Sequence, residues 1–286
     1  MLFLGLDLAW SEGSATKPAP DTGVALLDSA GRIVDAGWTS GIEDTLAWIE
    51  QVQVPDSLLF VDAPLIVMNP SGQRLCETHV AQGYWRWDVF ANSTNLSSPR
   101  LAGVRLREEL EQRGWLYSDG RGGPPVSGRV VCECYPYTAL VGAEELGYCD
   151  KRPRYKRKPK EMRAATWQPL RAENCDELIA RLAALEEAEP PLDLRSHPET
   201  KRLLEECSPF QSRAYKKRED LIDAVLCAWT AAFWWRHGEK RSQVLGVDLD
   251  NAVSKEPLAT IIAPARPEQR NPLRRGNVTN PAQIRF

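Results

Sequence analysis

The first ten residues constrain the fold most, because they form an almost unbroken apolar run with one carboxylate inside it. Met1 to Trp10 reads MLFLGLDLAW. A short apolar run of this kind, followed by loop residues, predicts a strand buried on both faces of a sheet. An ionised aspartate is costly to bury alone, so Asp7 must be hydrogen-bonded, ion-paired or bound to a metal. On this strand alone, an aspartate that caps the following turn is an equal alternative.

The same arrangement occurs twice more along the chain. Leu58 to Leu65 reads LLFVDAPL and carries Asp62, and Val130 to Pro136 reads VVCECYP and carries Glu133. Each acid is near the C-terminal end of a strand that is predicted to be buried. Because ligands bind at the carboxyl edge of sheets with parallel strands, we expect the three acids at one such edge.

The composition is that of an ordinary globular protein. Of the 286 residues, 43% are hydrophobic and 26% are charged. Met1 leads directly into the first strand, without the basic segment and cleavage site of a signal peptide. The longest apolar stretch, Leu221 to Trp235, is too short to span a bilayer and contains Asp223. We therefore expect a soluble, cytoplasmic protein with no membrane partner, folded as a single domain over residues 1–286.

Cysteines, histidines and net charge argue against three further kinds of site. The seven cysteines form no CxxC pair, which favours reduced structural thiols over a disulfide framework or a zinc site. The three histidines are far apart in sequence. A net charge of −3 argues against general binding of duplex nucleic acid, although Lys151 to Lys160 holds seven basic residues in ten.

The pattern between the first two acid-bearing strands predicts a hairpin and a helix. Turn residues at 28–31 separate two strands that are expected to pair antiparallel. Apolar residues then recur at helical spacing, and Ser40 is suited to cap that helix. The expected elements up to residue 146 are strands at 22–27 and 32–39, helices at 42–52, about 99–114 and about 138–146, and the strands of Asp62 and Glu133.

Two long insertions, about 66–98 and 150–212, interrupt this pattern. The first places Arg74 and Arg86 among aromatic residues, which indicates either a substrate-facing surface or, as we favour, a small satellite core under a long loop. The second is mostly helical and begins with the basic stretch, which is equally well explained as a solvated linker or as an arm that contacts phosphates. The expected substrate-binding residues of the two insertions are Arg74, Arg86, Arg154, Lys156, Arg157 and Lys158. A strand pair and a basic tail are expected over 243–286.

The strongest helical segment, Lys216 to His237, contributes two more acids. Asp220 and Asp223 are three residues apart and therefore share one face of the helix. Several alanines in this segment are small enough to let the helix lie close to a sheet. The helix dipole alone explains Asp220, but Asp223 begins the apolar stripe and needs something positive between helix and sheet.

The acids together offer only oxygen ligands, which suits Mg²⁺ or Mn²⁺ rather than zinc. We expect the metal ligands to be Asp7, Asp62, Asp220 and Asp223, and the catalytic groups to be Asp7, Asp62, Glu133 and Asp223. Carboxylates from strand ends and one late helix are suited to hold two cations close together. Such a pair activates a water and stabilises the leaving oxygen in phosphodiester cleavage.

The order of these elements resembles the ribonuclease H-like superfamily. The segments GLDLAW, FVDAPL, ECYP and DLIDAVLCAW resemble more closely the family called domain of unknown function 429, which is described as predicted ribonuclease H-fold nucleases. The resemblance covers nearly the whole chain. It implies an α/β fold, with a mixed five-stranded sheet of the ribonuclease H-like type flanked by helices and carrying helical insertions.

The resemblance also implies a role for each acid. Asp7 takes the first-strand position and Asp62 the fourth-strand position, while Asp223 takes the helix position, since DLID resembles the D-x-x-D of Holliday-junction resolvases of the RuvC kind. Glu133 matches the E-x-x-P of the family, which is not a standard ribonuclease H ligand. The helix-borne glutamate of true ribonuclease H has no clear counterpart, which disfavours a hybrid-specific ribonuclease.

We therefore expect a metal-dependent nuclease or phosphodiesterase acting on a nucleic acid or a nucleotide, with Mg²⁺ or Mn²⁺ as cofactor. One alternative is a phosphotransferase or ATPase of the actin, Hsp70 and sugar-kinase group. Against it, Asp7 is followed by Leu8-Ala9-Trp10 rather than by a glycine-rich turn, and no second copy of the domain is visible. The other alternative is a non-catalytic interaction module that keeps this fold.

Overall fold

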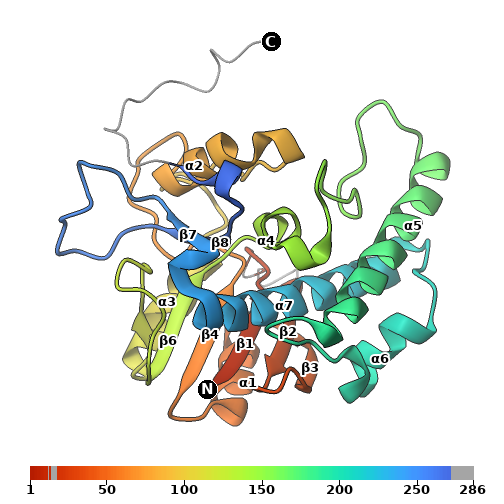
Figure 1. Ribbon diagram of the computed structural model, residues 1–286, viewed down its shortest axis with the longest axis horizontal. Coiled ribbons are helices and arrows are strands. Elements are labelled where there is room, and N and C mark those ends of the chain that lie inside the picture. The colour runs from red at the N-terminus through yellow and green to blue at the C-terminus, as the bar shows by residue number, and fades with distance from the viewer. Residues whose placement is uncertain (12, 14–17, 272–286) are drawn as a thin grey trace.

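A mixed sheet of six strands lies at the centre of the computed structural model, which describes residues 1–11, 13 and 18–271 (Figure 1). The strand order is β3-β2-β1-β4-β6-β5. The pairs β1–β4, β4–β6 and β6–β5 are parallel, whereas β2 pairs antiparallel with both β1 and β3. The strands are β1 Leu2–Asp7, β2 Asp21–Leu27, β3 Ile33–Ser40, β4 Ser57–Val61, β5 Leu116–Tyr117 and β6 Arg129–Glu133.

The expected number of five strands is wrong, because the sheet has six. The additional strand is β5, which pairs with β6 at the edge of the sheet. It has only two residues, Leu116 and Tyr117, and alternation between apolar and polar residues cannot mark so short a strand. The mixed α/β architecture and the antiparallel hairpin of β2 and β3 are confirmed.

Seven α-helices lie within the described residues. The first insertion contains α2, the second contains α5 and α6, and α7 follows it. The helices are α1 Gly41–Val52, α2 Leu75–Tyr84, α3 Ala102–Gln112, α4 Pro136–Gly142, α5 Ala164–Ala183, α6 Pro198–Glu205 and α7 Ser212–His237. None of the helices in the part of the chain that the structure describes is both long and apolar enough to cross a membrane.

The two faces of the sheet bury two separate apolar clusters. On one face, Leu4 and Leu6 of β1 pack with residues of α1 and α3, such as Leu46 and Leu106. On the other face, Phe3 packs in the cluster that contains most of α7, the helix that crosses the sheet in Figure 1. Successive strand residues point to opposite faces, so an odd-numbered residue of β1 faces α7.

Two glycines allow α7 to lie directly on the sheet. A Cβ on Gly5 of β1 would lie 2.1 Å from the carbonyl oxygen of Ala224 and 2.3 Å from the amide nitrogen of Ala228. A Cβ on Gly23 of β2 would lie 2.1 Å from the carbonyl oxygen of Asp220. The backbone of α7 therefore occupies the space that side chains would fill at these two strand positions.

A second, smaller sheet follows α7. It consists of β7 Ser242–Leu245 and β8 Ile261–Pro264, which pair antiparallel. Its buried residues Leu245, Ile261 and Ile262 belong to the apolar cluster of α7. The end of the expected basic tail, residues 272–286, lies outside the described residues.

The close approach of α7 predicts a large difference between two glycine substitutions. Gly5→Ala should lower the free energy of unfolding by about 1–3 kcal/mol or more, because the added methyl group meets the backbone of α7. Gly37→Ala is the matched control on β3, where an added Cβ meets nothing within 4 Å. It should leave stability unchanged or raise it slightly. Urea unfolding of both variants measures the difference, and equal stabilities would contradict the close approach.

Candidate metal centre

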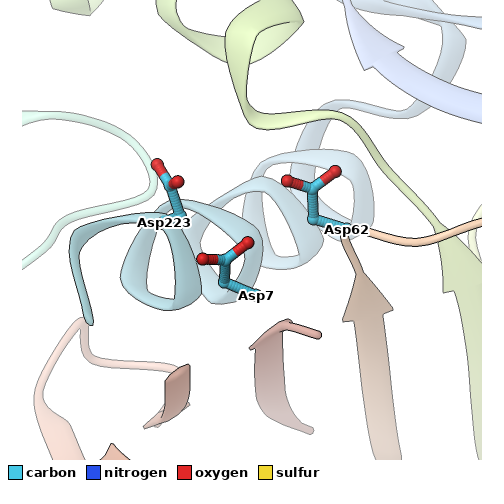
Figure 2. Close-up of side chains that lie close together, drawn as sticks. All are labelled: Asp7, Asp62 and Asp223. Carbon is cyan, nitrogen blue, oxygen red and sulfur yellow. The ribbon is translucent and has the colours of Figure 1, made fainter. Parts of the chain in front are cut away.

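Three aspartates from three different elements converge at the carboxyl edge of the central sheet. Asp7 is the last residue of β1, Asp62 follows β4 directly, and Asp223 lies on α7. One carboxylate oxygen of each lies within 4.8 Å of the others. Figure 2 shows the three side chains gathered where the two strands end against the helix.

The register of the parallel strands explains why Asp7 and Asp62 are neighbours. Leu6 pairs with Val61, and the amide of Asp62 donates to the carbonyl oxygen of Leu6 at 2.9 Å. The next residues along the two strands, Asp7 and Asp62, therefore lie side by side. Because each is two residues beyond a residue that faces α7, Gly5 or Phe60, both side chains point toward the helix.

The helix supplies two acids in adjacent positions on its inner face. Asp223 is fully buried, and Asp220 is 2% exposed. Asp220 forms an ion pair with Lys216 at 2.5 Å, one helical turn earlier, and a side-chain hydrogen bond with Asp7. Of the four expected metal ligands, Asp7, Asp62 and Asp223 thus form one cluster, and Asp220 lies beside it, attached through Asp7.

The basic stretch of the second insertion reaches into this cluster. The hydroxyl of Tyr155 donates to Oδ1 of Asp223 at 2.6 Å, and the ammonium group of Lys156 forms an ion pair with Oδ2 of the same aspartate. The side chain of Lys156 is only 16% exposed, and its Nζ lies 5.1 Å from the ring centroid of Tyr137. One lysine ammonium therefore supplies positive charge at the point where the acids meet.

Burial raises the pKa values of several of these acids. Removal from water raises the pKa of Asp62 to about 7, opposed by Lys156 and reinforced by the charge of Asp223. Burial likewise raises the pKa of Asp7 well above its ordinary value, and Lys156 again opposes the change. The pKa of Asp220 rises to about 6 for the same reason, with Lys216 opposing it. Proton uptake and cations thus compete to neutralise this cluster.

Glu133 lies at the same edge of the sheet but on the opposite face. It pairs with Val61, one residue before Asp62, so strand alternation directs its side chain away from α7. The position on β6 that corresponds to Asp62 is Cys134, whose thiol lies 3.4 Å from that of Cys227 on α7. The sequence predicts correctly that Glu133 lies at the carboxyl edge of the sheet. The face of the sheet on which its side chain lies depends on the register between β4 and β6.

A buried ion pair joins Glu133 to the first insertion. Two nitrogens of Arg74 donate to the two carboxylate oxygens of Glu133 at 2.8 and 2.7 Å, and Nε of Arg74 donates to Glu77 at 2.8 Å. Glu133 also accepts from the amide of Leu65 at 2.9 Å, and Arg74 donates to the carbonyl oxygen of Ile66 at 3.2 Å. Arg74 and Glu133 therefore fix the segment that directly follows Asp62.

The other expected substrate-binding residues are exposed and only lightly constrained. Arg86 lies over the ring of Trp85, with 5.6 Å between its Cζ and the ring centroid. In the basic stretch, Arg154 pairs with Asp88 at 3.0 Å, and Arg157 donates to the side chain of Asn92 at 2.9 Å. Lys158 donates to two backbone carbonyls. Of the six, Lys156 is the one in contact with the aspartate cluster, and Arg74 is buried away from solvent.

Three residues of the site were missed from the sequence, namely Tyr137, Tyr155 and Lys216. Lys216 has a recognisable signal, because it precedes Asp220 by four residues on one helix. Tyr155 has a weaker one, since it is the only aromatic residue within the basic stretch. Tyr137 has none, because its place beside Tyr155, at 5.8 Å between ring centroids, depends on packing between distant segments.

The donor set fits a hard divalent cation. The three nearest acids offer carboxylate oxygens, and two oxygens that bind one Mg²⁺ or Ca²⁺ lie at most about 4–5 Å apart. One carboxylate oxygen from each of Asp7, Asp62 and Asp223 lies within 4.8 Å of the other two, which is close to this separation. The buried acids also lack enough positive charge of their own, because four aspartates face two lysines, Lys156 and Lys216.

The raised pKa of Asp62 predicts a pH dependence of stability in the absence of divalent metal. Between the unfolded value of 3.8 and the folded value of about 7, the folded state binds more protons, so stability should fall as pH rises through this window. The slope contributed by one such group is at most about 1.4 kcal/mol per pH unit. Asp62→Asn should flatten the slope, and Asp150→Asn, at an exposed site, should not. Urea unfolding in the presence of a chelator measures this, and identical slopes in all three proteins would contradict the assignment.

Comparison with known proteins identifies a family. The family described as protein of unknown function (DUF429) matches residues 5–246, which include all of the acids discussed above. Searches of curated proteins and of solved structures each gave no match. Because the match spans most of the 286 residues, the chain belongs to the DUF429 family, as its sequence motifs predict.

Proposed function

We propose that the protein is a metal-dependent nuclease or phosphodiesterase of the ribonuclease H-like kind, acting on a nucleic acid or a nucleotide. The observation that carries this proposal is the convergence of Asp7, Asp62 and Asp223 from two parallel strand ends and one helix. Three carboxylates within 4.8 Å of one another are unfavourable unless a cation or protons neutralise them. Mg²⁺ or Mn²⁺ is the cation that an all-oxygen site of this kind favours.

The topology supports the ribonuclease H-like assignment. Three antiparallel strands, β1 to β3, precede α1, and β4 then pairs parallel with β1 at the centre of the sheet. The late helix α7 covers one face and carries its acid to the ends of β1 and β4. The short edge strand β5 is an addition to the five-stranded core of that fold.

Each residue of the cluster has a defined role in this proposal. Asp7, Asp62 and Asp223 would hold the ion, which would supply an activated water and stabilise the leaving oxygen of a phosphodiester. Tyr155 fixes the orientation of Asp223 through its hydroxyl. Arg74 and Glu133 act as positioning residues, because they hold the backbone at Leu65 and Ile66, just after Asp62. The exposed Arg154 and Arg157 lie on the same segment as Lys156 and are the residues that would contact substrate phosphates.

Metal-induced thermal stabilisation tests the proposal directly. Mn²⁺ or Mg²⁺ at about one hundred times its dissociation constant should stabilise the wild-type protein by about 2.7 kcal/mol, because the ion binds only the folded state. Asp62→Asn should lose most of this stabilisation, whereas Asp150→Asn should retain it. Cleavage of single-stranded, duplex and branched nucleic acids and of nucleotide diesters should follow the same pattern.

The same thermal measurements, repeated with ADP, distinguish the nuclease from the two alternative functions. Stabilisation by metal only when ADP is present would favour a phosphotransferase or ATPase over a nuclease. No response to metal, with or without ADP, would exclude the proposed metal centre and leave a non-catalytic module as the function of this fold.

Lys156 is expected to compete with the metal. Its ammonium group contacts Asp223, so ion binding must displace it. Lys156→Met should lower the dissociation constant of Mn²⁺ by about tenfold. The substitution removes a positive charge that stabilises the metal-free site by roughly 1.4 kcal/mol. Lys158→Met is the matched control, because the hydrogen bonds of Lys158 within the described part of the chain go to backbone carbonyls. Isothermal titration calorimetry measures both constants. Weaker metal binding by Lys156→Met would instead mean that this lysine orders the ligands.

A further inference from the structure

A positively charged pocket lies at the other end of α7 from the aspartate cluster. It has a volume of about 340 Å³ and is formed by the end of α4, the turn at 238–241 after α7, and the segment that follows β8. Its charged lining residues are Glu144, Glu239, Lys240, Arg241, Arg266 and Arg270. Since α7 rises about 1.5 Å per residue, the pocket is separated from Asp223 by roughly 20 Å. It is therefore a different site from the candidate metal centre.

Arg266 is a lining residue whose hydrogen-bond donors are incompletely satisfied by the described residues. Its Nε and Nη2 atoms are buried, and neither has a hydrogen-bond partner among the described residues. Buried donors of a charged group that remain unpaired are costly. Because the two atoms are covered in the empty pocket, an anion removes this cost when the guanidinium group turns toward the cavity. The guanidinium group presents its donors in a planar fork that matches the oxygens of a phosphate.

The neighbouring charges favour an anion as well. Arg270 donates to the backbone carbonyls of Glu239, Lys240 and Ser242, at 2.9, 2.6 and 3.3 Å, and it forms no ion pair with a carboxylate of the described residues. Lys240 is exposed and forms no ion pair with any described residue. Arg241 differs, because Glu145 binds it through two hydrogen bonds of 2.5 and 2.8 Å. Three cationic side chains of the pocket, Lys240, Arg266 and Arg270, thus have no carboxylate partner among the described residues.

Two glutamates add hydrogen-bond acceptors to the lining of the pocket. Glu144 and Glu239 line it without an ion pair to any cation in the described part of the chain. Carboxylates accept hydrogen bonds, and the hydroxyl groups of a sugar are suitable donors. A volume of about 340 Å³ is at the lower end of the range for small-molecule sites.

We propose that this pocket binds a phosphate monoester of a small polyhydroxylated molecule, such as a sugar phosphate. Arg266, Arg270 and Lys240 bind the phosphate, and Glu144 and Glu239 bind hydroxyl groups of the sugar. The walls are preformed: a Cβ on Gly142 would lie 1.9 Å from the carbonyl oxygen of Pro264, so α4 and β8 are in direct backbone contact. A preformed site loses little conformational entropy on binding.

Calorimetric titration of the full chain with ribose 5-phosphate, ribose and inorganic phosphate tests the proposal. A chelator is present, so that no metal bound at the aspartates contributes. Ribose 5-phosphate should bind, inorganic phosphate should bind more weakly, and ribose should not bind. Equal binding of ribose 5-phosphate and inorganic phosphate would overturn the sugar part of the proposal, and binding of neither would overturn all of it.

Variants locate the site and separate it from the metal centre. Arg266→Gln should weaken the binding of ribose 5-phosphate by about tenfold or more, because it removes a charged hydrogen-bonding partner. Lys240→Gln tests the same phosphate contact at an exposed position, where folding is not at risk. Arg195→Gln, an exposed arginine paired with Glu186 outside the pocket, should bind as the wild type does. Asp62→Asn should also bind normally. Unchanged binding by both Arg266→Gln and Lys240→Gln would overturn the proposal.

Discussion

The close contact between α7 and the first two strands determines the rest of the site. Gly5 and Gly23 leave no side chain between sheet and helix, so the backbone at Asp220, Ala224 and Ala228 lies against the strands. This contact brings the inner-face acids of α7 to the depth at which β1 ends in Asp7. A larger residue at either glycine would push the helix away, and the carboxylates would then separate. Packing of the smallest residues is therefore a condition for the electrostatics of the cluster.

The same contact creates a charge imbalance that distant segments correct. Four aspartates gather in a region largely removed from water, and burial raises the pKa of Asp62 to about 7. Lys216 comes from α7 itself, but Lys156 and Tyr155 come from the second insertion, more than sixty residues away along the chain. The insertion is thus tied to the acids by an ion pair and a hydrogen bond to one residue, Asp223. If the proposed cation binds, its affinity and the position of this segment are coupled, because both act on that carboxylate.

Features of the site that depend on local sequence patterns can be predicted from the sequence, whereas contacts between distant segments cannot. Asp7 and Asp62 are predictable because each interrupts an apolar strand, and Asp223 because it begins an apolar helix stripe. The face occupied by Glu133 is not predictable from its own strand, since it depends on a register of one residue between β4 and β6. The two-residue strand β5 is too short to leave a pattern. The contacts of Tyr155 and Lys156 with Asp223 arise only in three dimensions, and a run of basic residues gives no indication of which one turns inward.

The glycine contacts beneath α7 also separate the requirements of architecture from those of chemistry. Positions 5 and 23 demand glycine whatever the protein does, because backbone atoms of α7 fill the space where a Cβ would lie. The aspartates place no such demand on the backbone contact, and an asparagine occupies a similar volume. A relative that keeps the small residues and exchanges the acids would retain this architecture without an ion site. Divergence of function within such a fold therefore requires few substitutions, at positions other than those where the backbones of helix and sheet meet.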